Sequence, residues 1–234
     1  MQDKTNIGID AALELVQNAF VASGLHEQSA QSVARALVMA EAEGQVGHGF
    51  TRVGDYIAQM KSGKINANAA PSVMSQSPSY LHVSADNGFA YPALDLAIDQ
   101  AVQMAATTGC VAIAVSQSNH CGTLASHVEK LAMQGLIGIM VANTPAAIAP
   151  WGGNKPLYGT NPIAFAAPRV GQDPLVIDLS LSVVARGKVM NAKKTGQSIP
   201  AGWALDKDGQ PTTDPDAALD GGTMVPIGEA KGTA

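Results

Sequence analysis

A histidine and an arginine lie four residues apart in the segment Gly47-His48-Gly49-Phe50-Thr51-Arg52. One turn of helix would bring both side chains to the same face. Arginine holds a carboxylate through two parallel hydrogen bonds, and histidine gives or takes a proton near neutral pH. The pair therefore suits an anionic substrate with a carbonyl or hydroxyl group. The alternative is a helix-capping loop that leaves His48 and Arg52 on the surface without a chemical role.

A second candidate is His120, in the segment Ser118-Asn119-His120-Cys121-Gly122, which follows an apolar strand-like stretch. Ligands of α/β proteins gather beyond the carboxyl ends of strands. His120 is therefore a candidate site residue, and the alternative is a loop residue that caps the next helix. Three further histidines lack such surroundings and are interpreted as structural or solvated: His26, His82 and His127.

The sequence lacks the motifs that are typical of several other kinds of site. There is no HExxH, no Cys/His cluster at metal-ligand spacing, no Walker loop and no G-x-S-x-G. We therefore expect no metal site. A G-x-G-x-x-G after a strand is also missing, so residue patterns alone do not lead to a nicotinamide cofactor. The turn at residues 158–162 offers backbone N–H groups to a phosphate, with a purely structural turn as the alternative.

Alternating periodicities predict an α/β protein. Helices are expected within the first 63 residues and near 92–107, 124–134 and 183–193, with strands near 80–84, 111–115, 136–142, 163–167 and 175–179. Residues 1–75 are interpreted as a helical domain and residues 76–234 as an α/β domain. The stretch 198–220 is rich in Pro, Gly and Asp and is expected to be a long surface excursion.

Composition excludes some functions. Of the 234 residues, 46% are hydrophobic and 14% charged, and the net charge is −5 with no run of Lys or Arg. This argues against nucleic acid or an anionic membrane as the main partner. The longest apolar stretch, residues 136–142, is too short to span a bilayer. Two cysteines without a disulfide pattern and an N-terminus unlike a signal peptide predict a cytoplasmic protein.

Together, several stretches resemble the malate/L-lactate dehydrogenase family that is unrelated to the Rossmann-type lactate dehydrogenases. The family also contains ureidoglycolate and sulfolactate dehydrogenases and reductases of Δ1-piperideine-2-carboxylate and Δ1-pyrroline-2-carboxylate. The resemblance covers essentially the whole chain. It rests on residues 47–52, 118–120, 149–153, 156–164, 178–180, 185–188, 211–215 and 228–232.

The resemblance implies a set of roles. His48 is the expected proton donor to the reduced C=O or C=N, and Lys188 is a second candidate catalytic residue. Arg52 is the expected carboxylate anchor, and His120 contacts the substrate. Contacts to NAD or NADP are implied for Thr160, Asp178, Leu179, Ser180 and Ala230.

The fold implied is a non-Rossmann, largely antiparallel cofactor-binding sheet with helices, beside an N-terminal helical region. A homodimer is the implied assembly.

Two departures from the family pattern bear on the substrate. Gly47 stands where the family commonly has Ser, and Lys188 stands where the imine reductases have Asp. Both favour a dehydrogenase of the malate, lactate or sulfolactate kind, with cyclic-imine reduction as the alternative. Family members continue beyond the position of Ala234, so the C-terminal part of the fold is expected to be missing. A truncated, inactive relative is therefore another alternative.

Overall fold

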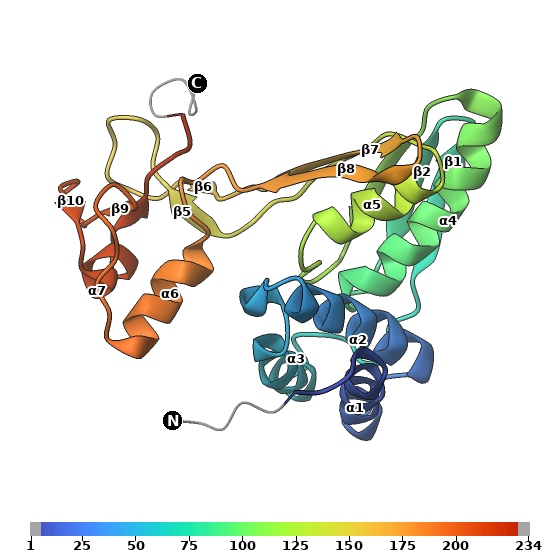
Figure 1. Cartoon of the computed structure of the whole chain (residues 1–234), viewed down its shortest axis with the longest axis horizontal. Helices are drawn as coiled ribbons and strands as arrows, with labels where there is room; N and C mark the ends of the chain where they lie inside the picture. Colours follow the sequence, from blue (N-terminus) through green and yellow to red (C-terminus); the bar gives the residue numbers. More distant parts are fainter. Residues whose placement is uncertain (1–5, 229–234) are drawn as a thin grey trace. The chain divides into compact units, whose positions relative to one another are not determined.

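The computed structural model describes residues 6–228. Internal contacts divide the chain into two compact units, Met1–Leu136 and Ile137–Ala234, which Figure 1 colours from blue to green and from yellow to red. Each unit is a mixture of helices and strands, as expected for an α/β protein. The domain boundary predicted between residues 75 and 76 falls inside the first unit.

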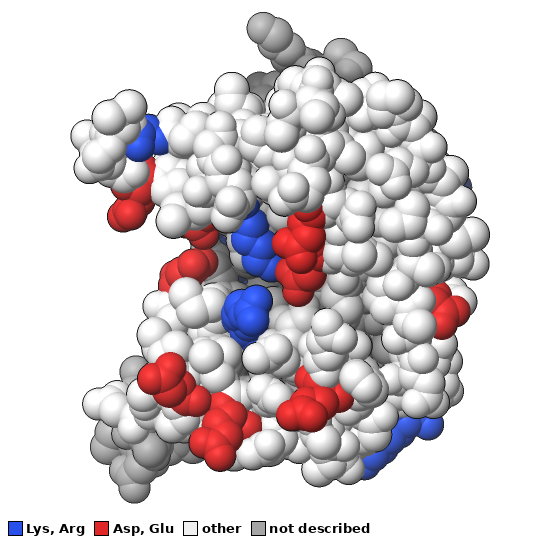
Figure 2. Space-filling view, turned by 90° about the vertical axis from the view of Figure 1, so that its right-hand side faces the viewer, with Lys and Arg blue, Asp and Glu red and all other residues white. Residues whose placement is uncertain are grey.

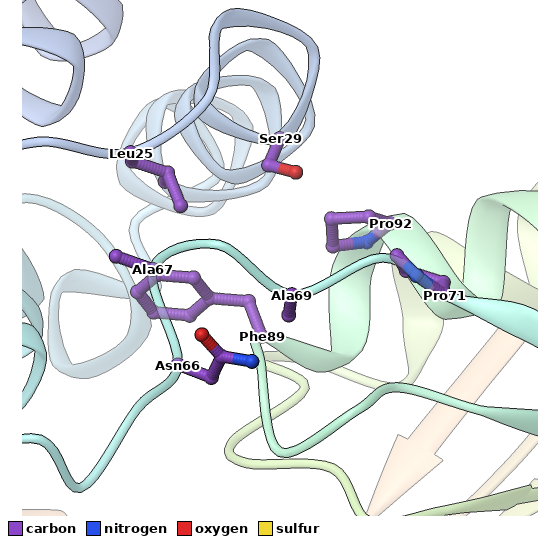
Figure 3. A pocket seen from close by; sticks show the side chains of 8 residues that line it. All are labelled: Leu25, Ser29, Asn66, Ala67, Ala69, Pro71, Phe89 and Pro92. Atoms are coloured by element: carbon purple, nitrogen blue, oxygen red, sulfur yellow. The ribbon is translucent and has the colours of Figure 1, made fainter.

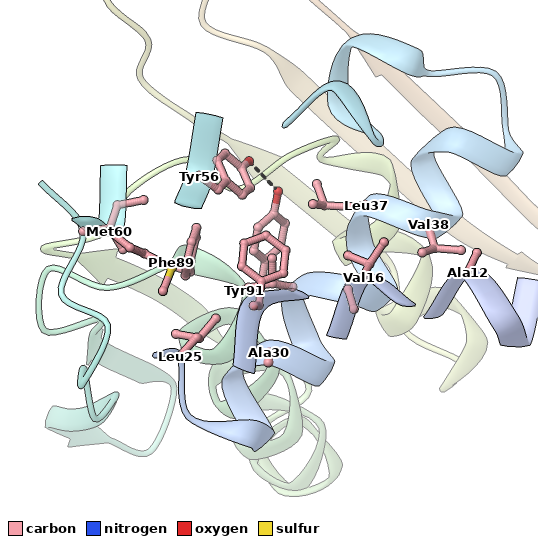
Figure 4. Close-up of a cluster of buried hydrophobic side chains, with 14 residues drawn as sticks. Ala12, Val16, Leu25, Ala30, Leu37, Val38, Tyr56, Met60, Phe89 and Tyr91 are labelled. Atoms are coloured by element: carbon pink, nitrogen blue, oxygen red, sulfur yellow. Dashed lines mark hydrogen bonds between the residues drawn. The ribbon is translucent and has the colours of Figure 1, made fainter. Parts of the chain in front are cut away.

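Helices form the N-terminal part of the first unit, as the periodicity predicted. They are α1 (Ile9–Ala22), α2 (Glu27–Ala42) and α3 (Thr51–Lys61), with a short 3-10 helix, η1 (Val46–His48), between the last two. Their apolar faces enclose a cluster that includes Phe20, Leu37 and Tyr56. Phe89 and Tyr91, at the start of α4, belong to the same cluster (Figure 4). The N-terminal helices thus share one core with the α/β part that follows.

The rest of the first unit is built on a three-stranded sheet. Strand β2 (Tyr80–Ser84), helix α4 (Ala90–Thr108) and strand β3 (Ala112–Ser116) form a crossover in which β2 and β3 pair in parallel. These elements and α5 (Ala125–Met133) confirm the predicted helices and strands. Strand β1 (Ser72–Ser77) was not predicted, because its polar sequence SVMSQS lacks an apolar alternation. It is exposed and pairs antiparallel with β2.

The loops after β2 and β3 are tied together. The turn after β2 contains Asp86 and Asn87, both with positive φ. Asn87 N donates to Gln117 O at 2.7 Å, and Asn119 N donates to Gly88 O at 3.0 Å. The segment that leads to His120 is therefore fixed to the neighbouring turn.

The second unit contains two sheets. In one, strands β4 (Gly138–Val141), β7 (Ile163–Arg169) and β8 (Gln172–Leu179) pair antiparallel. The other has the order β10-β9-β11-β5-β6, in which only the β11–β5 pair is parallel. Its strands are β5 (Ala146–Ile148), β6 (Tyr158–Gly159), β9 (Ala204–Leu205), β10 (Pro211–Thr212) and β11 (Thr223–Met224). Helices α6 (Arg186–Thr195) and α7 (Pro215–Leu219) complete the unit.

The prediction of a surface excursion over residues 198–220 was wrong. Ile199, Ala204 and Ala218 are buried in a core cluster with Val189 of α6. Helix α7 begins at Pro215 with Asp214 as its cap, whose side chain accepts a hydrogen bond from Asp216 N. A few buried apolar side chains hold the segment against the core. Because most of the surrounding residues are polar, the composition of the segment does not reveal them.

Two surface features bear on possible partners. Within residues 6–228, no helix is long and apolar enough to cross a membrane. On the face drawn in Figure 2, Lys and Arg side chains are few and lie near Asp and Glu, without a broad basic area.

Candidate active site

His48 ends the 3-10 helix η1, and its backbone is closely constrained. His48 N donates to Gln45 O at 2.7 Å, and the Glu41 carboxylate accepts from Phe50 N at 2.8 Å. A Cβ at Gly49 would overlap the Glu41 carboxylate and lie 3.0 Å from its Cα, so only glycine fits between them. A Cβ at Gly47, by contrast, would meet nothing within 4 Å. The second glycine is therefore the one on which the shape of this loop depends.

Arg52 lies in the first turn of α3, half-buried beside the same loop. Its Nε donates to Gly47 O at 2.7 Å, and its Nη1 lies 3.7 Å from the Asp55 carboxylate. These contacts orient the guanidinium while its other N–H groups stay available for an anion. The expected single helical turn is absent, because η1 ends at His48 and α3 begins at Thr51; Arg52 instead reaches the His48 loop through Gly47 O.

His120 lies beyond the carboxyl end of β3, as predicted, and faces His48. The two imidazole rings are stacked, with centroids 5.6 Å apart and planes inclined by 12°. Three candidates from two distant sequence segments, His48, Arg52 and His120, therefore come together within the first unit.

Two tyrosines complete this cluster, and sequence analysis missed both. Tyr56 Oη lies 2.5 Å from His120 Nδ1 and 2.9 Å from Tyr91 Oη (Figure 4). Tyr56 follows Arg52 by four residues, as Arg52 follows His48. Continuing the helical spacing by one turn would have found it. Tyr91 has no such signal, because α4 reaches the site only through the tertiary fold.

The surroundings shift the acidity of these groups. Desolvation lowers the pKa of His120 to about 4, and the charges of His48 and Arg52 act in the same direction. The ring itself still reaches solvent, but its neighbours replace much of the water around it. Burial raises the pKa of Tyr56 to about 12, and burial also raises that of Tyr91 well above its ordinary value. At neutral pH, both phenols keep their protons and His120 is uncharged.

The remaining histidines have the structural or solvated character that was expected. His127 is buried, and its Nε2 lies 2.8 Å from Cys121 O, which anchors the loop after His120. His82 Nε2 lies 2.8 Å from Ser116 Oγ, and His26 is exposed at the start of α2.

The predicted cofactor contacts belong to the second unit. Thr160 Oγ1 lies 3.2 Å from Thr144 Oγ1, and Thr160 O accepts from Leu181 N at 2.7 Å. This hydrogen bond brings Thr160 next to the end of β8. There, Asp178 and Leu179 are exposed and Ser180 Oγ lies 2.5 Å from Ser182 Oγ.

Two further candidates lie in or beyond this unit. Lys188 is exposed in the first turn of α6, as a solvated lysine would be. Ala230 lies outside the described residues.

Two pockets in residues 6–228 lie apart from the candidate residues: a small one in the first unit, and an open one of about 420 Å³ beside α6 and α7, lined in part by Lys193 and Asp214. No group of three or more His, Cys, Asp or Glu side chains in residues 6–228 is arranged to hold a metal ion. The small pocket in the first unit has room for about 10 Å³, one water at most. Its lining is mostly apolar, with Phe89 and Pro92 among the walls, and it contains none of the candidate residues (Figure 3).

Comparison with known proteins places the chain among oxidoreductases. Residues 7–234 match the family model described as malate/L-lactate dehydrogenase. A (2R)-3-sulfolactate dehydrogenase (NADP+) from Chromohalobacter salexigens is 50% identical over 228 residues, which are 97% of this chain and 68% of that protein. A Δ1-pyrroline-2-carboxylate/Δ1-piperideine-2-carboxylate reductase from Pseudomonas putida is 40% identical over 220 residues, or 94% of this chain and 64% of that protein.

Among solved structures, the Δ1-piperideine-2-carboxylate reductase from Pseudomonas syringae pv. tomato superposes with a TM-score of 0.94 at 36% identity. The match covers 98% of this chain and 69% of that one. The chain thus spans about two thirds of the length of the relatives that it matches.

Proposed function

We propose that this chain, which belongs to the malate/L-lactate dehydrogenase family, is an NAD(P)-dependent oxidoreductase that acts at C2 of a small 2-hydroxy or 2-oxo acid. The observation that carries the proposal is the cluster of His48, His120 and Arg52, with the two imidazoles stacked at 5.6 Å. The cluster combines groups for proton transfer with a cation for a carboxylate. A 2-oxo acid presents a carbonyl and a carboxylate side by side, which is the arrangement that such a cluster recognises.

The residues of the cluster take complementary parts in this chemistry. Arg52 binds the substrate carboxylate through the N–H groups that Gly47 O does not use. His48 gives a proton to the C2 oxygen in reduction and removes it in oxidation. A nicotinamide dinucleotide, when bound, supplies or accepts the hydride.

Residues of the second unit fit such a dinucleotide chemically. Thr160 and Ser180 offer hydroxyl groups, and Asp178 offers an exposed carboxylate to ribose hydroxyls. The chain also approaches itself closely at Gly159, where a Cβ would overlap Thr144 O. Such crowding supports a fixed loop beside Thr160. We assign Thr160, Asp178, Leu179 and Ser180 to cofactor binding.

The substrate that we favour is an acid with a second anionic group, of the sulfolactate type. The relative that is 50% identical is named a sulfolactate dehydrogenase. Lys188 is exposed, so its ammonium group is available to attract a distal sulfonate or carboxylate. Cyclic-imine reduction is the second candidate, since two reductases of that kind are 40% and 36% identical to this chain.

A substrate panel tests the proposal. We would follow NAD+ and NADP+ reduction with both enantiomers of sulfolactate, malate and lactate, and NADPH oxidation with Δ1-piperideine-2-carboxylate. Turnover of sulfolactate above the other substrates supports the assignment. Turnover of the imine without any 2-hydroxy acid would replace it by the second candidate.

The role of Lys188 has its own variant. Lys188→Ala should raise KM for sulfolactate or malate and leave KM for lactate, which lacks the second anion, nearly unchanged. Lys194→Ala, on the exposed C-terminal turn of the same helix, is the matched control. An equal rise of KM for all three acids would contradict a specific contact with the distal anion.

We also propose a homodimer in the cytoplasm. The support for a dimer is an apolar face on sheet β4-β7-β8, where Ile139 and Val141 are 70% and 69% exposed. Ile139 pairs across the sheet with Phe165, which pairs with Ile177, so their side chains share one face. Light scattering should give a dimer that Ile139→Lys weakens and Val170→Lys, at an exposed turn, does not. A monomeric wild-type protein would refute the proposed dimer.

A further inference from the structure

We propose that Tyr56 is a positioning residue, which holds His120 in the neutral tautomer that carries its proton on Nε2. In this state His120 donates a hydrogen bond to the substrate and leaves proton exchange to His48. The catalytic meaning rests on the proposed function, whereas the tautomer is a property of the free protein.

The argument begins with the direction of the hydrogen bonds at Nδ1. Gly122 N lies 3.4 Å from His120 Nδ1 with its N–H pointed at the ring nitrogen. A backbone N–H can only donate, so Nδ1 must accept and carries no proton. Tyr56 Oη, 2.5 Å from the same nitrogen, must then donate as well. A neutral ring that accepts at Nδ1 has its proton on Nε2.

The same reasoning continues into the core. Because Tyr56 donates its single hydroxyl proton to His120, the Tyr56 oxygen must accept the hydrogen bond from Tyr91 Oη, 2.9 Å away. Tyr91 thus orients Tyr56, which orients His120. Both phenol rings are 2% exposed and belong to the core of the first unit, so the relay is held rigidly. Burial raises both phenol pKa values, so neither residue loses its proton near neutral pH.

The loop that carries His120 is itself docked on the relay. Gly122 has φ +70°, and a Cβ there would lie 2.7 Å from Tyr91 Oη. A side chain at position 122 would therefore push the loop off Tyr91. On the other side, His127 of α5 holds Cys121 O at 2.8 Å. These contacts fix the Gly122 N–H on which the polarity of the relay depends.

Charge in the surroundings opposes a second proton on the ring. His48 faces the ring from η1, and Arg52 and Tyr56 face it from α3. Tyr91 stands behind Tyr56 on α4, and the carboxylate of Asp55 pairs with Arg52. The charges that act on the ring are thus those of His48 and Arg52, and the Asp55 carboxylate lies on Arg52. A hydrogen-bond donor that stays neutral polarises a carbonyl without giving up its proton.

The tautomer can be measured without any substrate. Long-range ¹H–¹⁵N correlation spectra of the free protein distinguish protonated from unprotonated ring nitrogens, and His120→Gln assigns the signals. We expect the signature of Nε2–H with bare Nδ1 from pH 8 down to about 5. A wild-type spectrum with the proton on Nδ1, or a doubly protonated ring at pH 7, would overturn the proposal.

Variants then test the role of Tyr56. Tyr56→Phe removes the shorter of the two hydrogen bonds to Nδ1 and leaves only the one from Gly122 N, so the His120 ring signals should shift and its pKa should rise. Tyr91→Phe should give a smaller change in the same direction. Tyr80→Phe, at an exposed tyrosine on β2, should give none. Unchanged His120 signals and pKa in a folded Tyr56→Phe protein would refute a positioning role.

Kinetics separate this role from a merely structural one. In Tyr56→Phe, we expect kcat/KM to fall about 10-fold or more. A folded Tyr56→Phe protein with unchanged kcat/KM would contradict the proposal. Because the spectra need no turnover, a failed substrate assignment leaves the tautomer test intact.

Discussion

The imidazole rings of His48 and His120 lie parallel to each other, with centroids 5.6 Å apart. One ring ends the 3-10 helix η1 and the other follows strand β3, so the contact exists only in the folded first unit. Two imidazoles at this distance do not both carry a charge without mutual repulsion. Their closeness therefore favours a division of roles in which one ring stays neutral and the other exchanges the proton.

The first prediction concerns the ring that exchanges the proton. His48→Ala should lower kcat about 10²- to 10⁴-fold, the usual contribution of a general acid or base. Folding should be unaffected, because the side chain is only half-buried. Steady-state kinetics and a thermal melt measure the two effects. His26→Ala, at an exposed histidine, is the control, and turnover retained by His48→Ala would refute its role as proton donor.

The second prediction concerns the cation of the site. Arg52→Lys keeps the charge but loses both the Nε contact with Gly47 O and the planar pair of donors. We expect KM for the acid to rise about 10- to 100-fold, since a charge-assisted hydrogen bond contributes about 1.5–3 kcal/mol. Arg35→Lys, at an exposed position of α2, should leave KM unchanged. A fall in kcat alone would argue against carboxylate binding by Arg52.

The two glycines beside His48 provide a matched pair for a third prediction. Gly49→Ala should destabilise the protein by about 1–3 kcal/mol, because its Cβ would collide with Glu41. The collision would also displace the carboxylate that accepts from Phe50 N. Gly47→Ala meets nothing within 4 Å and should change stability by less than about 0.5 kcal/mol. Urea unfolding compares them, and equal effects would contradict this account of the loop.

How much of this site the sequence predicts depends on the kind of contact. His48 and Arg52 lie four residues apart on either side of the junction between η1 and α3, and His120 follows the end of a strand, so local position in the sequence identified all three as candidates. Tyr91 lies on a helix whose approach to the site depends on how α4 packs in the core. No local pattern reports such a contact.

The same distinction holds for the fold. Helices α1 to α4 and strands β2 and β3 follow clear periodicities, and the structure confirms them. Strand β1 is polar and is held by pairing with β2, so its sequence gives no apolar alternation. Residues 198–220 misled the prediction because Ile199, Ala204 and Ala218 anchor a segment that is otherwise polar.

A fourth prediction concerns the contact between α2, α4 and α5. Asp95 Oδ2 accepts from Ser32 Oγ and Asp95 Oδ1 accepts from Lys130 Nζ, each at 2.5 Å. Burial alone would raise the pKa of Asp95, but the hydrogen bonds from Lys130 and Ser32 outweigh it and lower the pKa. Asp95→Asn should therefore destabilise the protein by about 1–3 kcal/mol near neutral pH. Asp99→Asn, at an exposed position of the same helix, is the control.

The sign of its pH dependence follows from the lowered pKa. The stability that Asp95 contributes is present above its ordinary pKa of 3.8 and is lost as the pH falls through the folded value. The difference between the wild type and Asp95→Asn, measured by urea unfolding, should shrink below about pH 4. A difference that stays constant down to pH 3 would contradict the ionic character of the contact.

The last prediction uses the lowered pKa of His120 in the same way, with the opposite kind of group. The folded value is about 4 and the ordinary value is 6.5. Between these limits, the unfolded chain binds a proton at position 120 that the folded chain does not. Stability should therefore fall as the pH drops from about 6.5 to 4 and be independent of this group above 6.5.

His120→Gln cannot take up the proton, so it should lose less stability than the wild type between pH 7.5 and pH 4.5. Urea unfolding of both proteins at the two pH values isolates this difference, because the carboxylates common to both cancel. Equal losses would mean that His120 titrates alike in the folded and unfolded chains, and its neutral state near pH 6 would no longer hold.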